Sequence, residues 1–416
     1  MIEYDPIKFK TGLAAALCSP YRAFYKCKQV VLEVEKIVSN TYAASTTYAD
    51  EEFILMDIYP KTNGTVSVSY GGLTKTITDT SGAEKPNAQQ VFFGIFNGVA
   101  DDVTTPENGI LTIQGDYETF SVGAFSYDDK ETKPCGCITN VVQFGNMTSI
   151  CEYAFEGCNS LHSITIPRSI TNIGVAAFKS CNYLENILVD KNNLFYSNDD
   201  TGVLFNKDRT RLLAAPGTIY GNYAVPDSVI SIDNYAFYDC SALTSISISN
   251  AYNNVTHIGS RSFQNCTNLT NVTINSGIGD IGEHAFRSCT ALAEFAVSDT
   301  GMYGTATSIG ERAFQACSAL TEFTIPDTVT SIGDYTFYSC SALADVVISS
   351  SVTSIGLNAL SQCSALSSVT FKNTSGWIVT STRDDISAGT SVNVTNAKNN
   401  ATLFKDTHSG KFWYRK

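Results

Sequence analysis

The chain has 416 residues, of which 43% are hydrophobic and 16% are charged, a composition typical of a folded, water-soluble protein. Forty acidic and 27 basic side chains give a formal net charge of −13. This charge excludes a general electrostatic grip on phosphate backbones, so nucleic acid is a poor candidate partner. No stretch approaches the roughly 20 apolar residues of a membrane span, so we expect no membrane insertion.

The N-terminal segment, residues 1–45, has the weakest pattern. Its stretch 29–38 is rich in β-branched residues, which favours a strand over a helix. The apolar stretch 12–18 is short and follows acidic residues, so we expect no secretory signal peptide. A lipoprotein site at Cys18 is disfavoured because the large Leu17 stands directly before it.

Residues 46–130 are predicted to form a small β-rich domain. Six short runs alternate apolar and polar residues and end at Gly, Asn, Pro or Asp: 53–59, 65–70, 73–78, 90–96, 109–113 and 120–125. Gly71 and Gly72 separate two of these runs, and such a pair is a tight hairpin signal. The pattern indicates a β-sandwich, with an immunoglobulin-like topology as a hypothesis.

Residues 137–372 repeat one pattern. A large anchor residue recurs at Phe155, Phe178, Phe237, Phe263, Phe286, Phe314, Phe337 and Leu360. The successive spacings are 23, 59, 26, 23, 28, 23 and 23 residues, so 23 is the unit and the larger values contain insertions. A period between about 20 and 29 residues is typical of a leucine-rich-repeat solenoid, in which each coil buries its apolar face against its neighbours.

Each unit contains two short strands and a turn. Residues 161–166 alternate apolar and polar side chains, and Pro167 then ends the strand because proline cannot donate a backbone hydrogen bond. Residues 169–174 alternate again. Glycine follows this second strand and is expected to adopt a positive φ at Gly174, Gly282, Gly310, Gly333 and Gly356.

This unit resembles that of the BspA-like leucine-rich repeats, I-G-x-x-A-F-x-x-C-x-x-L-x-x-I-x-I-P. Residues 307–348 follow it almost letter for letter, and the resemblance covers a little over half of the chain. It implies a mainly β solenoid, a right-handed superhelix of ~23-residue units preceded by the β-sandwich-like domain. The 59-residue interval is similar to the family's elongated repeat, which predicts one longer coil with a hairpin.

Cysteine is used in two ways. Eight of the 13 cysteines share one repeat position, so they are interpreted as small buried hydrophobes: Cys158, Cys181, Cys240, Cys266, Cys289, Cys317, Cys340 and Cys363. The alternative is cross-linking between neighbouring coils. Cys135 and Cys137 lie outside this position, and with no histidine nearby a buried or disulfide-bonded pair is favoured over a metal site.

Residues 373–416 lose the period and contain both tryptophans, Trp377 and Trp413. Short alternating stretches at 376–380 and 391–395 predict a small β cap whose aromatic rings cover the last coil. An aromatic platform for a ligand is the alternative.

No catalytic residue, metal site or cofactor is predicted. The chain has four histidines, no HExxH motif and no glycine-rich phosphate loop. Asp190, Asn192, Asp199 and Asp200 could hold calcium, but they lack the EF-hand spacing, which favours a solvated loop. An enzyme remains an alternative only if its site lies within the first 130 residues.

The strand alternation identifies a candidate binding face. Residues expected to point outward from the main sheet include His162, Thr165, Ser247, Asn271, Thr273, Glu322, Thr324 and Thr370. Thr165, Thr273, Thr324 and Thr370 would form a row of hydroxyls interrupted at three positions. A purely structural role is the alternative, because threonine suits an exposed pleated face whatever it binds.

Three functions follow. The resemblance implies a non-enzymatic adhesion protein that is extracellular or at the cell surface and binds a host or cell-surface protein or glycan. Without a secretion signal, a bacteriophage tail or fibre protein is the alternative, and a fibre would be trimeric; the oligomeric state is otherwise open. An enzyme that uses the N-terminal β domain is the third hypothesis.

Overall fold

In a computed structural model of the chain, the described residues are eight strands between residues 53 and 144, followed by residues 148–150, 152–248, 257–274, 279–297 and 307–416. Residues 1–45 lie outside the described residues. The predictions made for them, a strand at 29–38 and no secretory signal peptide, therefore stay predictions. The prediction for Cys135 and Cys137 also lies outside the described residues.

Seven strands precede the repeats: β1 (Phe53–Pro60), β2 (Thr65–Tyr70), β3 (Leu73–Thr78), β4 (Gln89–Phe96), β5 (Val99–Ala100), β6 (Ile110–Gly115) and β7 (Tyr117–Gly123). They include all six predicted strands and belong to two sheets, with the orders β7-β1-β4-β5 and β6-β2-β3. The predicted hairpin is confirmed, because β2 and β3 pair antiparallel with Tyr70 opposite Leu73. The immunoglobulin-like topology stays a prediction.

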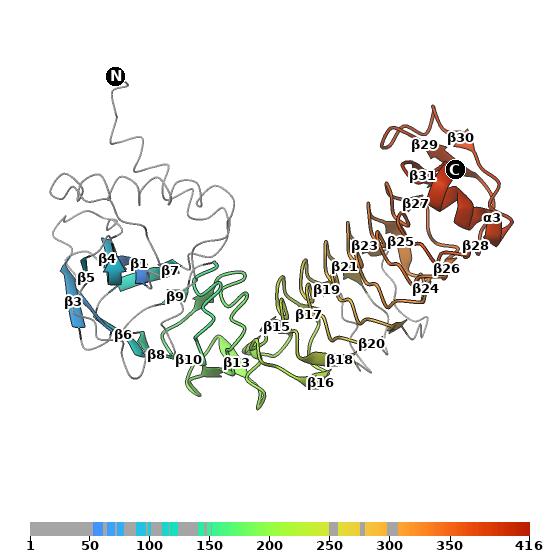
Figure 1. Cartoon of the computed structure of the whole chain (residues 1–416). Coiled ribbons are helices and arrows are strands. Elements are labelled where there is room, and N and C mark those ends of the chain that lie inside the picture. Colours follow the sequence, from blue (N-terminus) through green and yellow to red (C-terminus); the bar gives the residue numbers. More distant parts are fainter. Residues whose placement is uncertain are drawn as a thin grey trace, which may run out of the picture.

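The repeats form the predicted β-solenoid, which curves into an arc (Figure 1). One strand of each coil lies on the outer side of the arc: β8 (Asn140–Phe144), β10 (Ser163–Ile166), β12 (Asn186–Val189), β16 (Gly221–Val225), β18 (Leu243–Ile248), β20 (Asn271–Ile274), β22 (Glu294–Val297), β24 (Glu322–Thr324), β26 (Asp345–Ile348) and β28 (Ser368–Phe371). These are the outer strands.

A shorter strand of most coils lies on the inner side: β9 (Ser149–Ile150), β11 (Asn172–Ile173), β17 (Ser231–Ile232), β19 (His257–Ile258), β21 (Asp280–Ile281), β23 (Thr307–Ile309), β25 (Val329–Ile332) and β27 (Ser354–Ile355). Both N-terminal sheets continue into the solenoid, because β8 pairs parallel with β6 and β9 pairs parallel with β7. The first coil is therefore covered through backbone hydrogen bonds.

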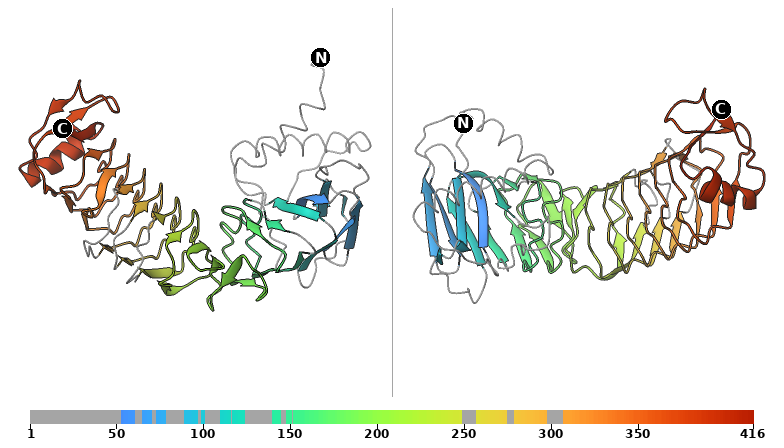
Figure 2. Two further views of the ribbon diagram at one scale, coloured as in Figure 1. Left: turned by 180° about the vertical axis from the view of Figure 1, so that it is seen from behind. Right: turned by 45° about the horizontal axis from the view of Figure 1, so that its top comes forward.

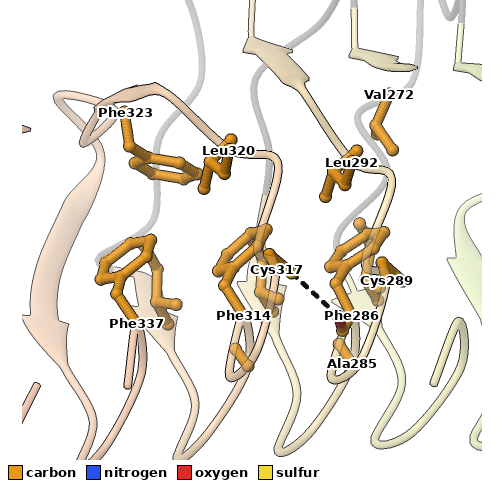
Figure 3. Packing of buried hydrophobic residues seen from close by; sticks show 14 of the residues in the cluster. Val272, Ala285, Phe286, Cys289, Leu292, Phe314, Cys317, Leu320, Phe323 and Phe337 are labelled. Carbon is orange, nitrogen blue, oxygen red and sulfur yellow. Dashed lines mark hydrogen bonds between the residues drawn. The ribbon is translucent and has the colours of Figure 1, made fainter. Parts of the chain in front are cut away.

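Five of the anchor phenylalanines form one stack through the coils from Phe237 to Phe337. Successive rings from Phe237 through Phe263, Phe286, Phe314 and Phe337 lie nearly parallel, with centroids 4.9, 4.9, 5.2 and 5.4 Å apart. Figure 3 shows part of this stack with the cysteines beside it. Every ring in this set is buried, so one continuous core holds the coils together.

The eight cysteines of the repeat position are free and buried, which confirms the interpretation as small core residues. Several of these thiols also donate a hydrogen bond to the preceding coil. The Sγ of Cys317 donates to the backbone oxygen of Phe286 in the preceding coil at 3.1 Å, and the Sγ of Cys340 does the same to Phe314 at 3.1 Å. Burial raises the pKa of these thiols above its ordinary value.

The prediction that the repeated glycines adopt a positive φ is wrong. Neither Gly282 nor Gly333 has a positive φ. Glycine is needed there because neighbouring coils approach closely: a Cβ atom at Gly282 would lie 2.6 Å from the Ser260 nitrogen, and one at Gly333 would lie 2.6 Å from the Glu311 nitrogen.

Left-handed backbone occurs instead two residues before and two residues after each anchor. His284 and Ser288, which flank Phe286, have φ values of 55° and 62°. Their amides donate to the next coil, to Glu311 O at 2.9 Å and to Gln315 O at 2.8 Å. These hydrogen bonds between coils offset the strain of a left-handed side-chain-bearing residue.

The long interval contains one elongated coil with a hairpin, as predicted. Between β12 and β16 the chain forms β13 (Tyr196–Asn198), β14 (Leu204–Asn206) and β15 (Arg211–Ala214), with β13-β14 and β14-β15 antiparallel. We call residues 186–220 the elongated coil. It has no anchor phenylalanine, and a Cβ atom on Gly217 would meet the backbone oxygen of Cys181, so this coil packs without a large side chain at that point.

The C-terminal residues cover the last coil with β29 (Trp377–Thr380), β30 (Thr390–Ser391), helix α3 (Ala397–Thr402), the π-helical turn η1 (Leu403–Thr407) and β31 (Phe412–Arg415). Strand β31 pairs antiparallel with β27 and β29. Trp377 and Trp413 are 2% and 1% exposed, and the Trp413 ring stacks on Phe404 at 4.1 Å. The two ends of the solenoid are thus covered by different structures (Figure 2).

Candidate binding surface

The predicted outward residues lie on or beside the outer strands, and all of them reach the surface. His162, Glu322, Thr324 and Thr370 are exposed, while Thr165, Ser247, Asn271 and Thr273 are half-buried between neighbouring side chains. The alternation follows from the pleat, because the intervening apolar residues of each strand point into the core. Whether this face binds a ligand stays a prediction.

The structure does not bring these residues into one row. Ser247 lies between Ala224 and Thr273, and Thr324 is separated from Thr370 by Val347. The outer strands belong to separate sheets, which end between β12 and β16 and again between β22 and β24. The expected neighbour of Thr165 is replaced by Leu188 on β12, so the predicted row of hydroxyls consists of three separate pieces.

Asn271 organises the middle piece. Its Nδ2 donates to Glu294 Oε2 on the next strand at 2.6 Å, and its Oδ1 accepts from Thr273 Oγ1 at 2.9 Å. Ser245 Oγ, one strand earlier, donates to Asn222 Oδ1 at 2.8 Å. These contacts hold the side chains in fixed positions, which reduces the entropy that a ligand would have to remove.

A pocket of about 480 Å³ lies where the outer sheet is interrupted between β22 and β24. Two predicted residues, Glu322 and Thr324, line it. Glu294, Asp327 and Lys372 add charged groups, and Phe295 adds an apolar wall. The Lys372 ammonium lies 2.9 Å from an Asp327 carboxylate oxygen, while Glu322 has no side-chain partner among the described residues.

Two neighbouring aromatic rings lie at the interruption. Phe295 and Phe323 occupy the core position of β22 and β24 at which β18, β20 and β26 have isoleucine or valine. Their rings lie 5.5 Å apart, and each also packs edge-on against Phe314 at 5.0 Å. Phe295 therefore belongs both to the contact between the coils and to the wall of the pocket.

The predicted outward set omitted β12 and β16, and exposed large apolar residues lie on β12 and directly before β16. Five of the seven exposed large hydrophobic residues among those described lie in or next to the elongated coil: Tyr183, Leu188, Leu194, Phe195 and Tyr220. The Tyr183 ring lies 6.5 Å from the exposed ring of His162. The register contained the signal, because Leu188 occupies on β12 the position that Thr165 has on β10.

The acidic residues of the elongated coil serve its own structure. Asp199 accepts from the Thr201 and Val203 nitrogens, each at 3.0 Å, and from the Tyr223 hydroxyl at 2.7 Å. Burial and then this hydrogen bond raise the pKa of Tyr223. Within the described part of the chain, no three His, Cys, Asp or Glu residues are grouped as a metal site would require.

The sequence matches the family described as "BspA type Leucine rich repeat region" in six copies, over residues 128–200, 220–303 and 298–407, which is more than half of the chain. The chain belongs to this family. Its repeats support a binding role, since leucine-rich-repeat proteins generally recognise other molecules without catalysis. No curated protein matches the chain.

Several solved structures are similar. One is a leucine rich cell surface protein from Faecalibacterium prausnitzii A2-165, with 25% identity, a TM-score of 0.43, and coverage of 63% of this chain and 58% of that chain. A leucine-rich repeat protein from Bacteroides ovatus ATCC 8483 has 26% identity, a TM-score of 0.36, and coverage of 57% and 67%. A third, from Eubacterium ventriosum ATCC 27560, has 21% identity, a TM-score of 0.42, and coverage of 62% and 91%.

The described residues include no helix that is both long and apolar enough to span a membrane. Three surfaces are candidate binding sites. They are the exposed outer strands, the pocket between β22 and β24, and the exposed apolar residues of the elongated coil.

Proposed function

We propose that this protein is a non-enzymatic recognition and adhesion protein that presents its outer strands to a protein or glycan on another cell. Membership of the BspA-type family supports a binding role for the repeats. The family also favours an extracellular or cell-surface location. The alternative of a bacteriophage tail or fibre protein gains no support from the family match or from the similar structures.

The pocket between β22 and β24 is the observation that carries this proposal. Here the side chains of the outer side surround a volume of about 480 Å³. A few polar groups beside an apolar wall are typical of a binding pocket. Glu322 and Thr324, predicted from the alternation, and the Asp327–Lys372 ion pair provide those groups.

The chemistry of the pocket favours a ligand rich in hydroxyl or amine donors. Three of its lining side chains are carboxylates, those of Glu294, Glu322 and Asp327, and one is cationic. The Glu322 carboxylate, which has no side-chain partner among the described residues, can accept hydrogen bonds without breaking an existing one. We therefore place the first contact with the cell-surface ligand at Glu322 and Thr324.

The test uses the full chain, purified and labelled, on a glycan array and on immobilised matrix proteins. The double variant Glu322→Gln with Thr324→Ala should lose about tenfold or more in affinity for whichever probe the wild type binds, because it removes charged hydrogen bonds. Thr370→Ala, on the same row but outside the pocket, is the matched control and should bind like the wild type.

Two results would contradict this proposal. Equal loss of binding in Thr370→Ala and in the double variant would mean that the whole face, and not the pocket, makes the contact. Retention of binding by the double variant, with loss in a Leu188→Ser variant, would move the site to the elongated coil.

A further inference from the structure

The positive charge of the main solenoid is concentrated in one place. Between residues 212 and 371 the sequence has 12 acidic residues and only three lysines or arginines: Arg261, Arg287 and Arg312. All three lie in the anchor turns of consecutive coils, two residues before or one residue after the anchor phenylalanine. A chance distribution along the coils would have scattered them over the outer and inner faces as well.

The stacking of the coils brings these arginines to one surface around His284. The amide of Arg261 donates to Glu283 O at 2.8 Å, and the amide of His284 donates to Glu311 O at 2.9 Å, so Arg261, His284 and Arg312 occupy the same position in successive coils. Burial, and then the charges of the three arginines, lower the pKa of His284 to about 4.

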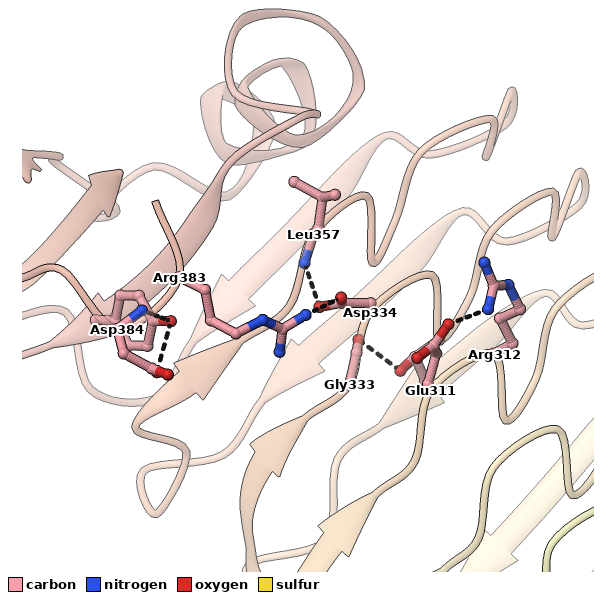
Figure 4. Close-up of polar contacts among 9 residues, drawn as sticks. Glu311, Arg312, Gly333, Asp334, Leu357, Arg383 and Asp384 are labelled. Atoms are coloured by element: carbon pink, nitrogen blue, oxygen red, sulfur yellow. Dashed lines mark hydrogen bonds and ion pairs between the residues drawn. The ribbon is translucent and has the colours of Figure 1, made fainter. Parts of the chain in front are cut away.

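Two of the three charges are not neutralised by a carboxylate. Arg312 forms an ion pair with Glu311, as Figure 4 shows, and its guanidinium lies 4.8 Å from the centroid of the Tyr335 ring. Within the part of the chain that the structure describes, the Arg261 guanidinium donates only to the Tyr235 hydroxyl, at 3.3 Å. Among the described residues, the Arg287 side chain has no hydrogen-bond or ion-pair partner.

Tyrosine pairs lie at both ends of the cluster. Tyr235 packs against Tyr238, and Tyr335 packs against Tyr338, each at 5.6 Å between ring centroids. We call this surface the turn stripe: Tyr235, Tyr238, Arg261, His284, Arg287, Arg312, Tyr335 and Tyr338. Ring contacts within the tyrosine pairs, and of Arg261 and Arg312 with Tyr235 and Tyr335, order these side chains before a partner arrives. Tyrosine and arginine are also the residues enriched in protein–protein hot spots.

The stripe has a measurable length. The five anchor rings beneath it are spaced 4.9, 4.9, 5.2 and 5.4 Å apart, so it extends about 20 Å. An extended chain rises roughly 3.3 Å per residue, so about six residues would span it. Such a segment would meet aromatic rings at its ends and arginines at its centre.

We propose that the turn stripe binds an extended acidic segment of a partner protein. Its central carboxylates pair with Arg261 and Arg287, and apolar side chains at its ends pack on the two tyrosine pairs. Guanidinium groups bind carboxylates in a bidentate manner, which sets the register of the segment.

This inference is independent of the pocket between β22 and β24, because no residue of the turn stripe lines that pocket. A variant can therefore lose binding at the turn stripe and keep binding at the pocket, or the reverse. Both kinds of binding can be measured on the same protein preparation.

The test measures fluorescence anisotropy of a labelled peptide with four glutamates between two phenylalanines, titrated with the full chain at low salt. Arg261→Gln with Arg287→Gln should weaken binding about tenfold or more, because each arginine provides a charged hydrogen bond. Arg168→Gln, an exposed arginine outside the stripe, should leave the affinity unchanged. The same peptide with glutamine in place of glutamate should not bind.

Arg287→Gln alone provides a second variant. Its substitution should leave the thermal midpoint unchanged, since this side chain has no hydrogen-bond or ion-pair partner among the described residues. Absence of peptide binding by the wild type, or equal weakening by Arg168→Gln, would overturn the proposal. A heparin fragment that binds through Arg261 and Arg287 while the acidic peptide does not would also overturn it, and would identify an anionic glycan as the partner.

Discussion

The regular coils and the elongated coil solve the same packing problem with different chemistry. A regular coil buries an anchor ring and a thiol, as Phe286 and Cys289 do at 0% exposure. The elongated coil buries the ring of Phe205, also at 0% exposure, but it lacks a phenylalanine in an anchor turn. A buried amide, Asn193, adds polar contacts, donating to Pro167 O at 2.8 Å and Ile170 O at 3.0 Å and accepting from the amides of Phe195 and Tyr196.

The same difference explains which residues are exposed. In a regular coil every large apolar residue has a place in the register of the core, so few remain on the surface. The elongated coil departs from that register, and Leu194 and Tyr220 are 77% and 80% exposed. The elongated coil has no anchor phenylalanine, and Lys179 of the preceding coil lies next to tyrosines of the following coil. Its ammonium is 4.8 Å from the Tyr238 ring centroid and 5.5 Å from that of Tyr235. Regular coils therefore provide stability, and the irregular coil makes apolar surface available for contacts.

The largest expected effect is on the anchor stack. Phe286→Ala should lower the free energy of unfolding by about 3–5 kcal/mol, because it removes a buried ring and leaves a cavity between two neighbouring rings. Urea unfolding followed by circular dichroism measures this loss. Phe195→Ala in the elongated coil is the matched control and should cost less than about 0.5 kcal/mol, since its ring is about half exposed. Equal losses would remove the distinction between the coils.

The anchor period was enough to predict coils such as the one around Phe314, because a buried ring every 23 residues has only one way to be covered. The interruption next to Phe323 could not be predicted, since pairing between two coils is not encoded in the alternation of either strand. The positive φ of His284 could not be predicted from the sequence either. It depends on a hydrogen bond to the next coil, and no local propensity encodes that bond.

The sequence predicted the candidate binding site only as the outward face of the main sheet, without a pocket. The alternation placed Glu322 and Thr324 correctly on the surface, but the pocket that they line arises from the interrupted sheet. Arg261 and Arg287 were visible in the sequence as isolated residues. Their proximity depends on the left-handed turns, which turn these side chains toward the same surface in successive coils. The helix α3 also escaped prediction, because its six residues include three asparagine or threonine residues of low helix propensity.

The second largest effect is expected at the polar centre of the elongated coil. Asn193→Ala should cost about 2–3 kcal/mol, because it leaves buried backbone donors and acceptors unpaired. Hydrogen exchange should show the loss first in β13 and β14, while the stack around Phe286 stays protected. The neighbouring Asn192→Ala is the control, since this side chain is exposed. It should change the rate of hydrogen exchange neither in β13 and β14 nor around Phe286. Faster exchange throughout the solenoid would mean that the elongated coil does not unfold as a separate unit.

A smaller effect concerns alkaline pH. Burial raises the pKa of Cys363 from the ordinary 9.0 to about 12. Between these values the folded state retains a proton that the unfolded state has lost, so the free energy of unfolding decreases as pH rises. Thermal midpoints measured between about pH 8 and about pH 10.5 should fall less in Cys363→Ala than in the wild type. Parallel curves would show that this thiol ionises in the folded protein.

The smallest expected effect on stability is at Tyr220. Because its side chain is 80% exposed, Tyr220→Ser should change the free energy of unfolding by less than about 0.5 kcal/mol. The matched substitution in the buried part of the next outer strand, Tyr223→Ser, should destabilise the protein by a few kcal/mol, because Tyr223 is 6% exposed and donates to Asp199.

If Tyr220→Ser proved as destabilising as Tyr223→Ser, the exposed rings of the elongated coil would belong to the core. They would then not be available for contacts with a partner. A neutral Tyr220→Ser that also weakened binding to cells would instead assign that ring to recognition, since no structural role would remain to account for it.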